Sequence, residues 1–172
     1  MSCLSIEWLP PKIDICEGTF KKIVQTLYAR FQMDIKCGNI IFQGFKVGYQ
    51  PGYEPSGMGY EKIFWHLITA DETITGERVL DHERASRLSW IKPVLEHSSE
   101  PCIKVWDYEE ANRKMGIRTY VWLEELDFII VLQKVVLRSD KTVMDIITSF
   151  HIDGPSYRAK IRKKWEKRLQ ES

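Results

Sequence analysis

The chain of 172 residues is 44% hydrophobic and 28% charged, and its net charge is +1. These values are typical of a globular protein, exclude wholesale disorder and predict a single domain that needs no disulfide or metal to fold. No run approaches the ~20 apolar residues that a membrane-spanning helix requires, and the N-terminus lacks the basic and apolar parts of a signal peptide. We therefore expect a cytoplasmic protein with no membrane partner.

The cysteines do not form a metal-binding or redox pattern. They contain no CxxC pair and have no histidine at zinc-site spacing; the four are Cys3, Cys16, Cys37 and Cys102. We expect reduced thiols, as is usual in the cytosol, and neither a metal nor another cofactor.

The first half of the chain alternates between apolar periodic segments and breaker-rich segments. In chain order it predicts an irregular segment over 1–13, an amphipathic helix over 17–31, a strand or hairpin over 40–49 that is interrupted near Gly44, a loop rich in Gly and Pro over 50–60, and a strand over 62–69.

The second half predicts a helix, a run of antiparallel strands and a terminal helix. The helix covers 82–97, with Asp81 as its cap and Pro93 disturbing its last turns. The strands are expected at 103–106, 120–122, 127–137 and 142–152. Pro155 opens the terminal helix. This order of elements predicts an α+β fold.

Positive charge is concentrated at the C-terminal end. Between Pro155 and Ser172 there are two acidic and seven basic residues, the latter being Arg158, Lys160, Arg162, Lys163, Lys164, Lys167 and Arg168. The segment therefore has a net charge of +5, whereas the whole chain has a net charge of only +1. This helix is a candidate surface for contacting phosphates.

His66 is the first candidate for chemistry, because it lies in an aromatic and apolar segment directly after the loop rich in Gly and Pro. Imidazole accepts and donates protons near neutral pH. The alternative is a hydrogen-bonded histidine in the core or at a sheet edge.

Arg84 and Arg87 are three residues apart on the predicted helix, so their guanidinium groups can project together and clamp a phosphate or carboxylate. The alternative is an ordinary solvated helix on which Glu83 and Arg87 form an i, i+4 ion pair.

The last predicted strand carries Thr148, Ser149 and His151 where it leaves the sheet. Alternation places Ser149 and His151 on one face and Thr148 and Phe150 on the other. Either hydroxyl can donate to a phosphate oxygen; the alternative is a polar strand end near a sheet edge. Lys134, in the middle of the longest strand, is a further candidate contact, since lysine is rarely buried without a partner.

Several sharper motifs are absent from the sequence: it has no GxxxxGK[ST], no HExxH and no GxSxG. The residues quoted above nevertheless follow an order that resembles one nuclease group. The order is Gly-Tyr-Glu-Lys-Ile-Phe-Trp-His66-Leu, then Glu83 to Ile91, then Ile147 to His151, then a basic helix with Lys163-Lys164-Trp165. It is similar to the phage- and toxin-associated branch of the barnase, EndoU, colicin and RelE-like (BECR) nucleases, and covers about Tyr60 to Leu169.

The resemblance implies N-terminal helices packed on a curved antiparallel β-sheet, followed by the basic C-terminal helix. It implies a nuclease domain over 60–172, with 1–59 as an extension or a family-specific part of the same domain. It also implies a metal-independent ribonuclease of toxin type, with RNA as substrate and an antitoxin or immunity protein as partner.

The same resemblance suggests roles for individual residues. His66 matches an early catalytic histidine, Arg84 and Arg87 match basic positions on a helix, and Thr148 and Ser149 match the hydroxyl position of the last strand. Phe150 lies where an aromatic residue, often tyrosine, is expected. In the implied reaction His66 is the base or acid, an arginine stabilises the phosphate, a hydroxyl positions a phosphate oxygen, and His151 is a second proton-transfer group.

The implied product of the reaction is a 2′,3′-cyclic phosphate. Tyr53, Trp65 or Trp90 would stack an unpaired base. Two other functions stay open on the sequence alone. One is a non-catalytic nucleic-acid-binding or protein-interaction module of a phage or mobile element that uses the terminal helix, and the other is a regulatory partner domain with no nucleic acid.

Overall fold

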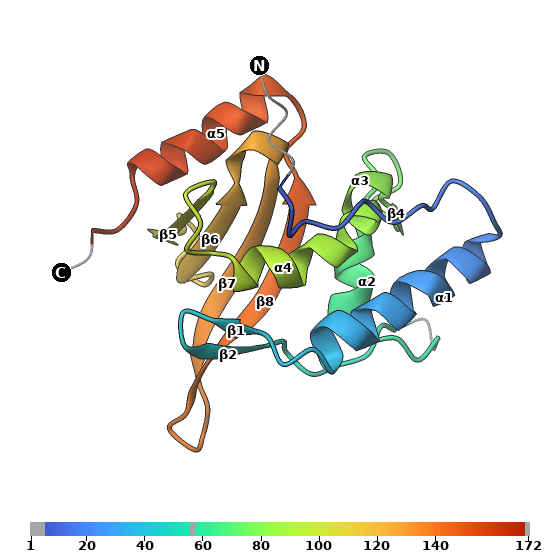
Figure 1. Ribbon diagram of the computed structural model, residues 1–172, viewed down its shortest axis with the longest axis horizontal. Helices are drawn as coiled ribbons and strands as arrows, with labels where there is room; N and C mark the ends of the chain where they lie inside the picture. Colours follow the sequence, from blue (N-terminus) through green and yellow to red (C-terminus); the bar gives the residue numbers. More distant parts are fainter. Residues whose placement is uncertain (1–5, 56–57, 171–172) are drawn as a thin grey trace.

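A computed structural model describes residues 6–55 and 58–170 (Figure 1). Its main feature is a curled, mixed six-stranded sheet in the order β1-β2-β8-β7-β6-β5, with a separate pair formed by β3 and β4. The α+β prediction is confirmed. The strands are β1 (Ile41–Phe42), β2 (Phe45–Gly48), β3 (Thr69–Asp71), β4 (Arg78–Leu80), β5 (Ile103–Glu109), β6 (Ile117–Leu123), β7 (Phe128–Val136) and β8 (Thr142–His151).

The predicted antiparallel meander is correct for the four long strands β5 to β8. The sheet as a whole is mixed, however, because β2 pairs with β8 in parallel, with Lys46 opposite Val143 and Gly48 opposite Asp145. That pairing covers only the first half of β8. Among the described residues, no strand pairs with residues 146–151 on that side, so the second half of β8 is an open sheet edge.

The two faces of the sheet bury different side chains, as strand alternation requires. On one face, Val121 and Ile130 belong to the larger core, which also includes Leu27 of helix α1 (Phe20–Phe31). On the other face, Trp122 and Ile129 belong to a smaller core beneath helix α5 (Gly154–Glu166). The larger core joins residues from both sides of position 60, so the two parts of the chain share one sheet and one core.

The described residues form five α-helices, of which α5 lies on one side of the sheet and α1 to α4 lie on the other (Figure 1). The first confirms the predicted amphipathic helix, with Thr19 as its cap and Val24, Leu27 and Phe31 buried. The helices are α1 (Phe20–Phe31), α2 (Lys62–Ile68), α3 (His82–Ser86), α4 (Ile91–Glu96) and α5 (Gly154–Glu166). None of the helices in the described part of the chain has the length and apolar character needed to cross a bilayer.

The strand predicted over 62–69 is wrong, because these residues form helix α2 and only Thr69 begins a short strand. Phe64, Leu67 and Ile68 are fully buried and follow the i, i+3, i+4 spacing of a helix. A short run that is apolar on both faces fits either period, so its periodicity does not distinguish the two structures.

The helix predicted over 82–97 is divided into α3, a 3₁₀ turn over Leu88–Trp90, and α4. Asp81 caps α3 as predicted, with its carboxylate accepting from the Arg84 amide at 3.0 Å. The break lies just before Pro93, not after it. A proline ring clashes with the carbonyl four residues earlier, here that of Ser89 in the turn.

The basic helix α5 docks on the smaller core through Ile161, which is 2% exposed, and Trp165. Polar contacts hold it at both ends: Arg158 pairs with Asp127, and Lys164 donates to both oxygens of Glu110 at 2.8 Å. About half of its basic residues are therefore engaged in holding the helix to the sheet.

Candidate functional site

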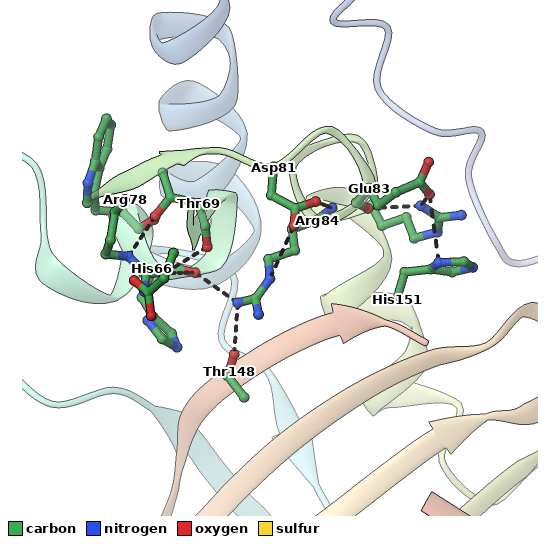
Figure 2. A network of polar contacts seen from close by, with 11 residues as sticks. His66, Thr69, Arg78, Asp81, Glu83, Arg84, Thr148 and His151 are labelled. Carbon is green, nitrogen blue, oxygen red and sulfur yellow. Dashed lines mark hydrogen bonds and ion pairs between the residues drawn. The ribbon is translucent and has the colours of Figure 1, made fainter. Parts of the chain in front are cut away.

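Helices α2 and α3 lie against the open edge of β8, where no described strand pairs with it. Polar side chains from all three elements meet there (Figure 2). His66 comes from the last turn of α2, Arg84 from α3 and Thr148 from β8. The structure thus brings together three of the residues that the sequence singled out.

Arg84 lies at the centre of this group. Its Nη1 is 3.4 Å from both the His66 carbonyl and Thr148 Oγ1, and its Nε is 3.8 Å from Asp81. All three contacts are long for charge-assisted bonds, which are usually about 2.7–2.9 Å. The Arg84 side chain is 20% exposed, and burial lowers its pKa. It is therefore a partly desolvated cation whose three polar side-chain contacts with described residues are all loose.

His66 is partly buried beside two arginines. Burial, followed by the charges of Arg78 and Arg84, lowers the pKa of His66 from 6.5 to about 4. The ring is consequently neutral at physiological pH and has a free lone pair, which is the form required of a proton acceptor.

Arg78 of β4 is a member of this group that sequence reasoning did not find. It donates to Thr69 Oγ1 at 3.0 Å, to the Thr69 carbonyl at 2.7 Å, to the His66 carbonyl at 3.3 Å and to Asp71 at 3.1 Å. These contacts hold the end of α2 against the β3–β4 pair, so Arg78 positions His66. Its only sequence signal is an isolated arginine in a polar loop, which is not diagnostic.

A cleft of about 970 Å³ opens beside His66. Its wall is mostly apolar and is formed by the Gly- and Pro-rich loop, α2 and the start of the open strand edge; Pro51, Met58, Trp65, Ile146 and Ile147 contribute. Gln50, the first residue of this loop, attaches the loop to β8, because its Nε2 donates to the buried Asp145 at 2.5 Å. The cleft is large enough for a nucleoside, with His66 and Arg78 among its polar groups.

The structure does not form the predicted clamp of Arg84 and Arg87, because the two guanidinium groups have different partners. Arg87 is 5% exposed, forms the i, i+4 ion pair with Glu83 and lies over the ring of Trp90 at 5.2 Å. The alternative considered for Arg87, an ion pair with Glu83, is the observed one.

His151 lies beside this ion pair, with Nδ1 3.9 Å from Glu83. Its Nδ1 is buried and has no hydrogen-bond partner among the described residues, and burial, followed by the charge of Arg87, lowers the pKa of His151. His151 therefore belongs to a second group of polar residues, which is built around Glu83 and not around Arg84.

A smaller hollow of about 140 Å³ lies on this side of Arg84. Arg84 and His151 line it together with Tyr157, which enters from the first turn of α5 and stacks on Phe150 with ring centroids 5.6 Å apart. The place of Tyr157 beside Arg84 depends on long-range packing between α5 and the end of β8, which no local sequence pattern contains.

The two hydroxyls of the last strand face opposite ways, as alternation predicted. Thr148 contacts Arg84 at the open edge, whereas Ser149 is 1% exposed opposite Ile130 of the larger core. Ser149 is therefore not accessible to a substrate in this structure, and Thr148 is the available hydroxyl.

The residues proposed to bind bases and phosphates have different surroundings. Trp90 is 5% exposed and its Nε1 donates to the Pro10 carbonyl at 2.9 Å, so its ring is a core element and the stacking prediction is wrong. Tyr53 is 70% exposed on the Gly- and Pro-rich loop. Lys134 is exposed, with its amine 5.1 Å above the Phe45 ring and among the residues of a different, polar hollow.

On α5, Lys164 is not a free cation because it is bonded to Glu110 and to the Tyr120 hydroxyl. Lys160, Lys163 and Lys167 are exposed and form no ion pair with any described residue. Their i, i+3, i+7 spacing puts them on one face of the helix. We call these three residues the lysine stripe.

Within residues 6–55 and 58–170, no group of three or more His, Cys, Asp or Glu side chains is arranged to hold a metal ion. Cys16, Cys37 and Cys102 are free thiols, while Cys3 lies outside the described residues. Comparisons with models of protein families, with curated proteins and with solved structures gave no match to this chain.

Proposed function

We propose that the protein is a metal-independent endoribonuclease of toxin type, acting on cytoplasmic RNA at the open edge of β8. In this reaction the ribose 2′-OH attacks the adjacent phosphorus, the 5′-oxygen leaves, and the product is a 2′,3′-cyclic phosphate. The protein must supply a proton acceptor for the 2′-OH and positive charge for the developing phosphorane. An antitoxin or immunity protein is the partner expected of such an enzyme.

The observation that carries the proposal is the loosely held Arg84 guanidinium next to a neutral His66. A cation that is partly desolvated stabilises developing negative charge more strongly than a solvated one. Its present partners, two of them 3.4 Å away, are weak enough for a phosphate oxygen to replace them. Thr148 is in place to donate to the same phosphate.

Burial and neighbouring positive charge lower the pKa of His66, and this low pKa suits the imidazole to the role of base. Its pKa of about 4 keeps it unprotonated in the cell. Binding of an anionic phosphate next to Arg84 would offset the positive charge that depresses this pKa, and so bring the imidazole closer to the value that favours proton transfer.

The surroundings support a single-stranded substrate. The apolar cleft with Trp65 can take an unstacked base, and the exposed Tyr53 lies on the loop at its rim. The lysine stripe extends from the end of α5 that carries Tyr157, so a bound strand can continue along it from the site. DNA lacks the attacking 2′-OH and is expected to resist cleavage.

The test is incubation of the purified protein with total RNA in excess EDTA, followed by analysis of the new 3′ ends. We expect cyclic-phosphate ends from the wild type, and a loss of at least 100-fold in rate for His66→Ala. His82→Ala is the matched control, because His82 is exposed and its ring has one polar side-chain contact in the described part of the chain, with the Cys16 thiol at 3.7 Å. Equal cleavage by all three proteins, or no cleavage of total RNA or of any short single-stranded RNA, would contradict the proposal.

The second candidate function is a nucleic-acid-binding module, and the lysine stripe is the observation that favours it. Three unpaired lysines on one helix face bind phosphates without any catalytic group. The two functions differ in their dependence on His66. A binding module keeps its full RNA affinity in His66→Ala and cleaves nothing, whereas the enzyme loses cleavage in that variant while it still binds RNA.

A further inference from the structure

An inference that rests on the proposed function concerns the second proton transfer. Cleavage by the 2′-OH is complete only when the departing 5′-oxygen gains a proton, since an unprotonated alkoxide is a poor leaving group. In an in-line displacement the attacking and leaving oxygens lie on opposite sides of phosphorus. The acid therefore has to be found across the phosphate position from His66.

The order of residues along the edge of β8 defines these two sides. Ile146 and Ile147 line the large cleft that contains His66. Phe150 and His151 line the small hollow. Thr148 lies between the two pairs and contacts Arg84, so a phosphate held by Arg84 has the large cleft on one side and the small hollow on the other.

Tyr157 is placed in the small hollow by two independent features. Its ring stacks on Phe150, with centroids 5.6 Å apart and an interplanar angle of 22°, which fixes the ring plane. It also lies in the first turn of α5, a helix attached to the sheet by the Arg158–Asp127 pair one residue later. Tyr157 is 38% exposed and lines the hollow, so a substrate in the hollow can reach this residue.

We propose that Tyr157 is the general acid that protonates the leaving 5′-oxygen. As the 2′-oxygen forms its bond to phosphorus, His66 takes the 2′-OH proton. As the bond from phosphorus to the 5′-oxygen breaks, the Tyr157 hydroxyl gives its proton to that oxygen. The tyrosinate then regains a proton from water, His66 releases one, and the products are a cyclic phosphate and a 5′-hydroxyl.

His151 is the competing acid in the same hollow, and its protonation state disfavours it. Burial, with the charge of Arg87 next, lowers the pKa of His151, so little imidazolium is present at neutral pH. Burial raises the pKa of Tyr157, opposed by Arg84, so its hydroxyl carries a proton throughout the neutral range. Three carboxylates also line the hollow: Asp81 is bonded to Arg84, Glu83 to Arg87, and Asp153 is exposed.

Leaving-group chemistry tests the role directly. Two short single-stranded RNAs are compared, one natural and one with sulfur in place of the 5′-bridging oxygen at the cleavage site, because a thiolate leaves without protonation. We expect Tyr157→Phe to slow cleavage of the natural RNA by about 100-fold or more and to cleave the sulfur-substituted RNA within a few-fold of the wild-type rate. Tyr108→Phe, which alters another tyrosine beside α5, is the control and should cleave both substrates normally.

Each other outcome has a distinct meaning. Equal slowing of both substrates by Tyr157→Phe would show a packing role and overturn the proposal, and so would a wild-type rate on the natural RNA. Leaving-group rescue in His151→Gln instead would assign the acid to His151 and also overturn it. A wild-type protein that cleaves neither substrate would contradict the ribonuclease function itself, and the role of Tyr157 with it.

Discussion

Arg84 and Thr148 are 64 residues apart in the sequence, yet Nη1 of the arginine lies 3.4 Å from the threonine hydroxyl at the open edge of β8. The contact exists because β2 pairs with only the first half of β8, which leaves the second half for helix α3 to approach. A complete strand neighbour would occupy this position. The short β2 strand is therefore what makes room for the candidate site.

The loose contacts of Arg84 predict that it can be replaced at little cost in stability. For Arg84→Gln we expect a change in the free energy of unfolding within about 1 kcal/mol, since long hydrogen bonds contribute little. The rate of RNA cleavage should fall by about 10²–10³-fold, as for loss of a group that stabilises the transition state. Urea unfolding and cleavage rates measure the two effects.

Arg113→Gln is the control for Arg84→Gln, because Arg113 is exposed in the loop between β5 and β6 and forms no ion pair with a described residue. It removes the same charge and should leave both quantities unchanged. Similar cleavage by the two variants would show that Arg84 has no special role.

His66 predicts a specific dependence of stability on pH. Its folded pKa, about 4, is below the ordinary value of 6.5, so between these values the unfolded state binds more protons than the native state. The free energy of unfolding therefore falls as pH drops from 6.5 to 4 and is insensitive to His66 outside that window. Each unit of pKa displacement is worth about 1.4 kcal/mol, and we expect about 2 kcal/mol in all because the partly buried ring is screened by water.

His66→Gln cannot titrate, so the difference between its unfolding free energy and that of the wild type isolates this contribution. Carboxylates with lowered pKa values, such as Glu61 and Glu83, also lose stability in acid, but they do so in both proteins. Urea unfolding at half-unit steps from pH 4 to 8 gives the difference curve. A curve that is flat across this range would contradict the assigned burial of His66.

Much of the fold was predictable from the sequence because strand alternation and helix caps are local signals. The long strand at Phe128–Val136 and the cap at Asp81 are examples. Segment 62–69 was assigned wrongly because its buried residues satisfy both periods. Its helical form depends on packing against α1, where the ring centroids of Phe64 and Phe31 are 5.3 Å apart. No local sequence pattern contains this tertiary contact.

The candidate site was predictable only in part, for a related reason. His66, Arg84 and Thr148 were found because of their residue types. Arg78 and Tyr157 were missed because their relevance comes from the β3–β4 pair and from the docking of α5, both of which are tertiary features. Trp90 was assigned to stacking because an aromatic side chain suits both a binding surface and a core.

The Glu83–Arg87 pair predicts an unequal cost for removing its two members. Arg87 is 5% exposed and Glu83 is about half exposed, so Glu83→Gln leaves a buried cation without its carboxylate. We expect that variant to lose about 2–3 kcal/mol, whereas Arg87→Met, which replaces the cation with an apolar chain, should lose about 1 kcal/mol. The double variant should be more stable than Glu83→Gln alone, as urea unfolding will show; additive losses would argue against a coupled pair.

The lysine stripe predicts a change in the salt dependence of RNA binding. For single strands, the slope of log K against log salt concentration is about −0.7 for each phosphate that the protein neutralises. Changing Lys160, Lys163 and Lys167 to Gln should therefore make the slope about 2 units shallower, measured by fluorescence anisotropy with a labelled single strand. The control changes Lys21, Lys22 and Lys141 to Gln; these lysines are exposed and unpaired among the described residues, and they belong to α1 and to the turn between β7 and β8. Because the net charge changes equally, a general electrostatic attraction would affect both triple variants alike, whereas contact along α5 would change the slope only in the first.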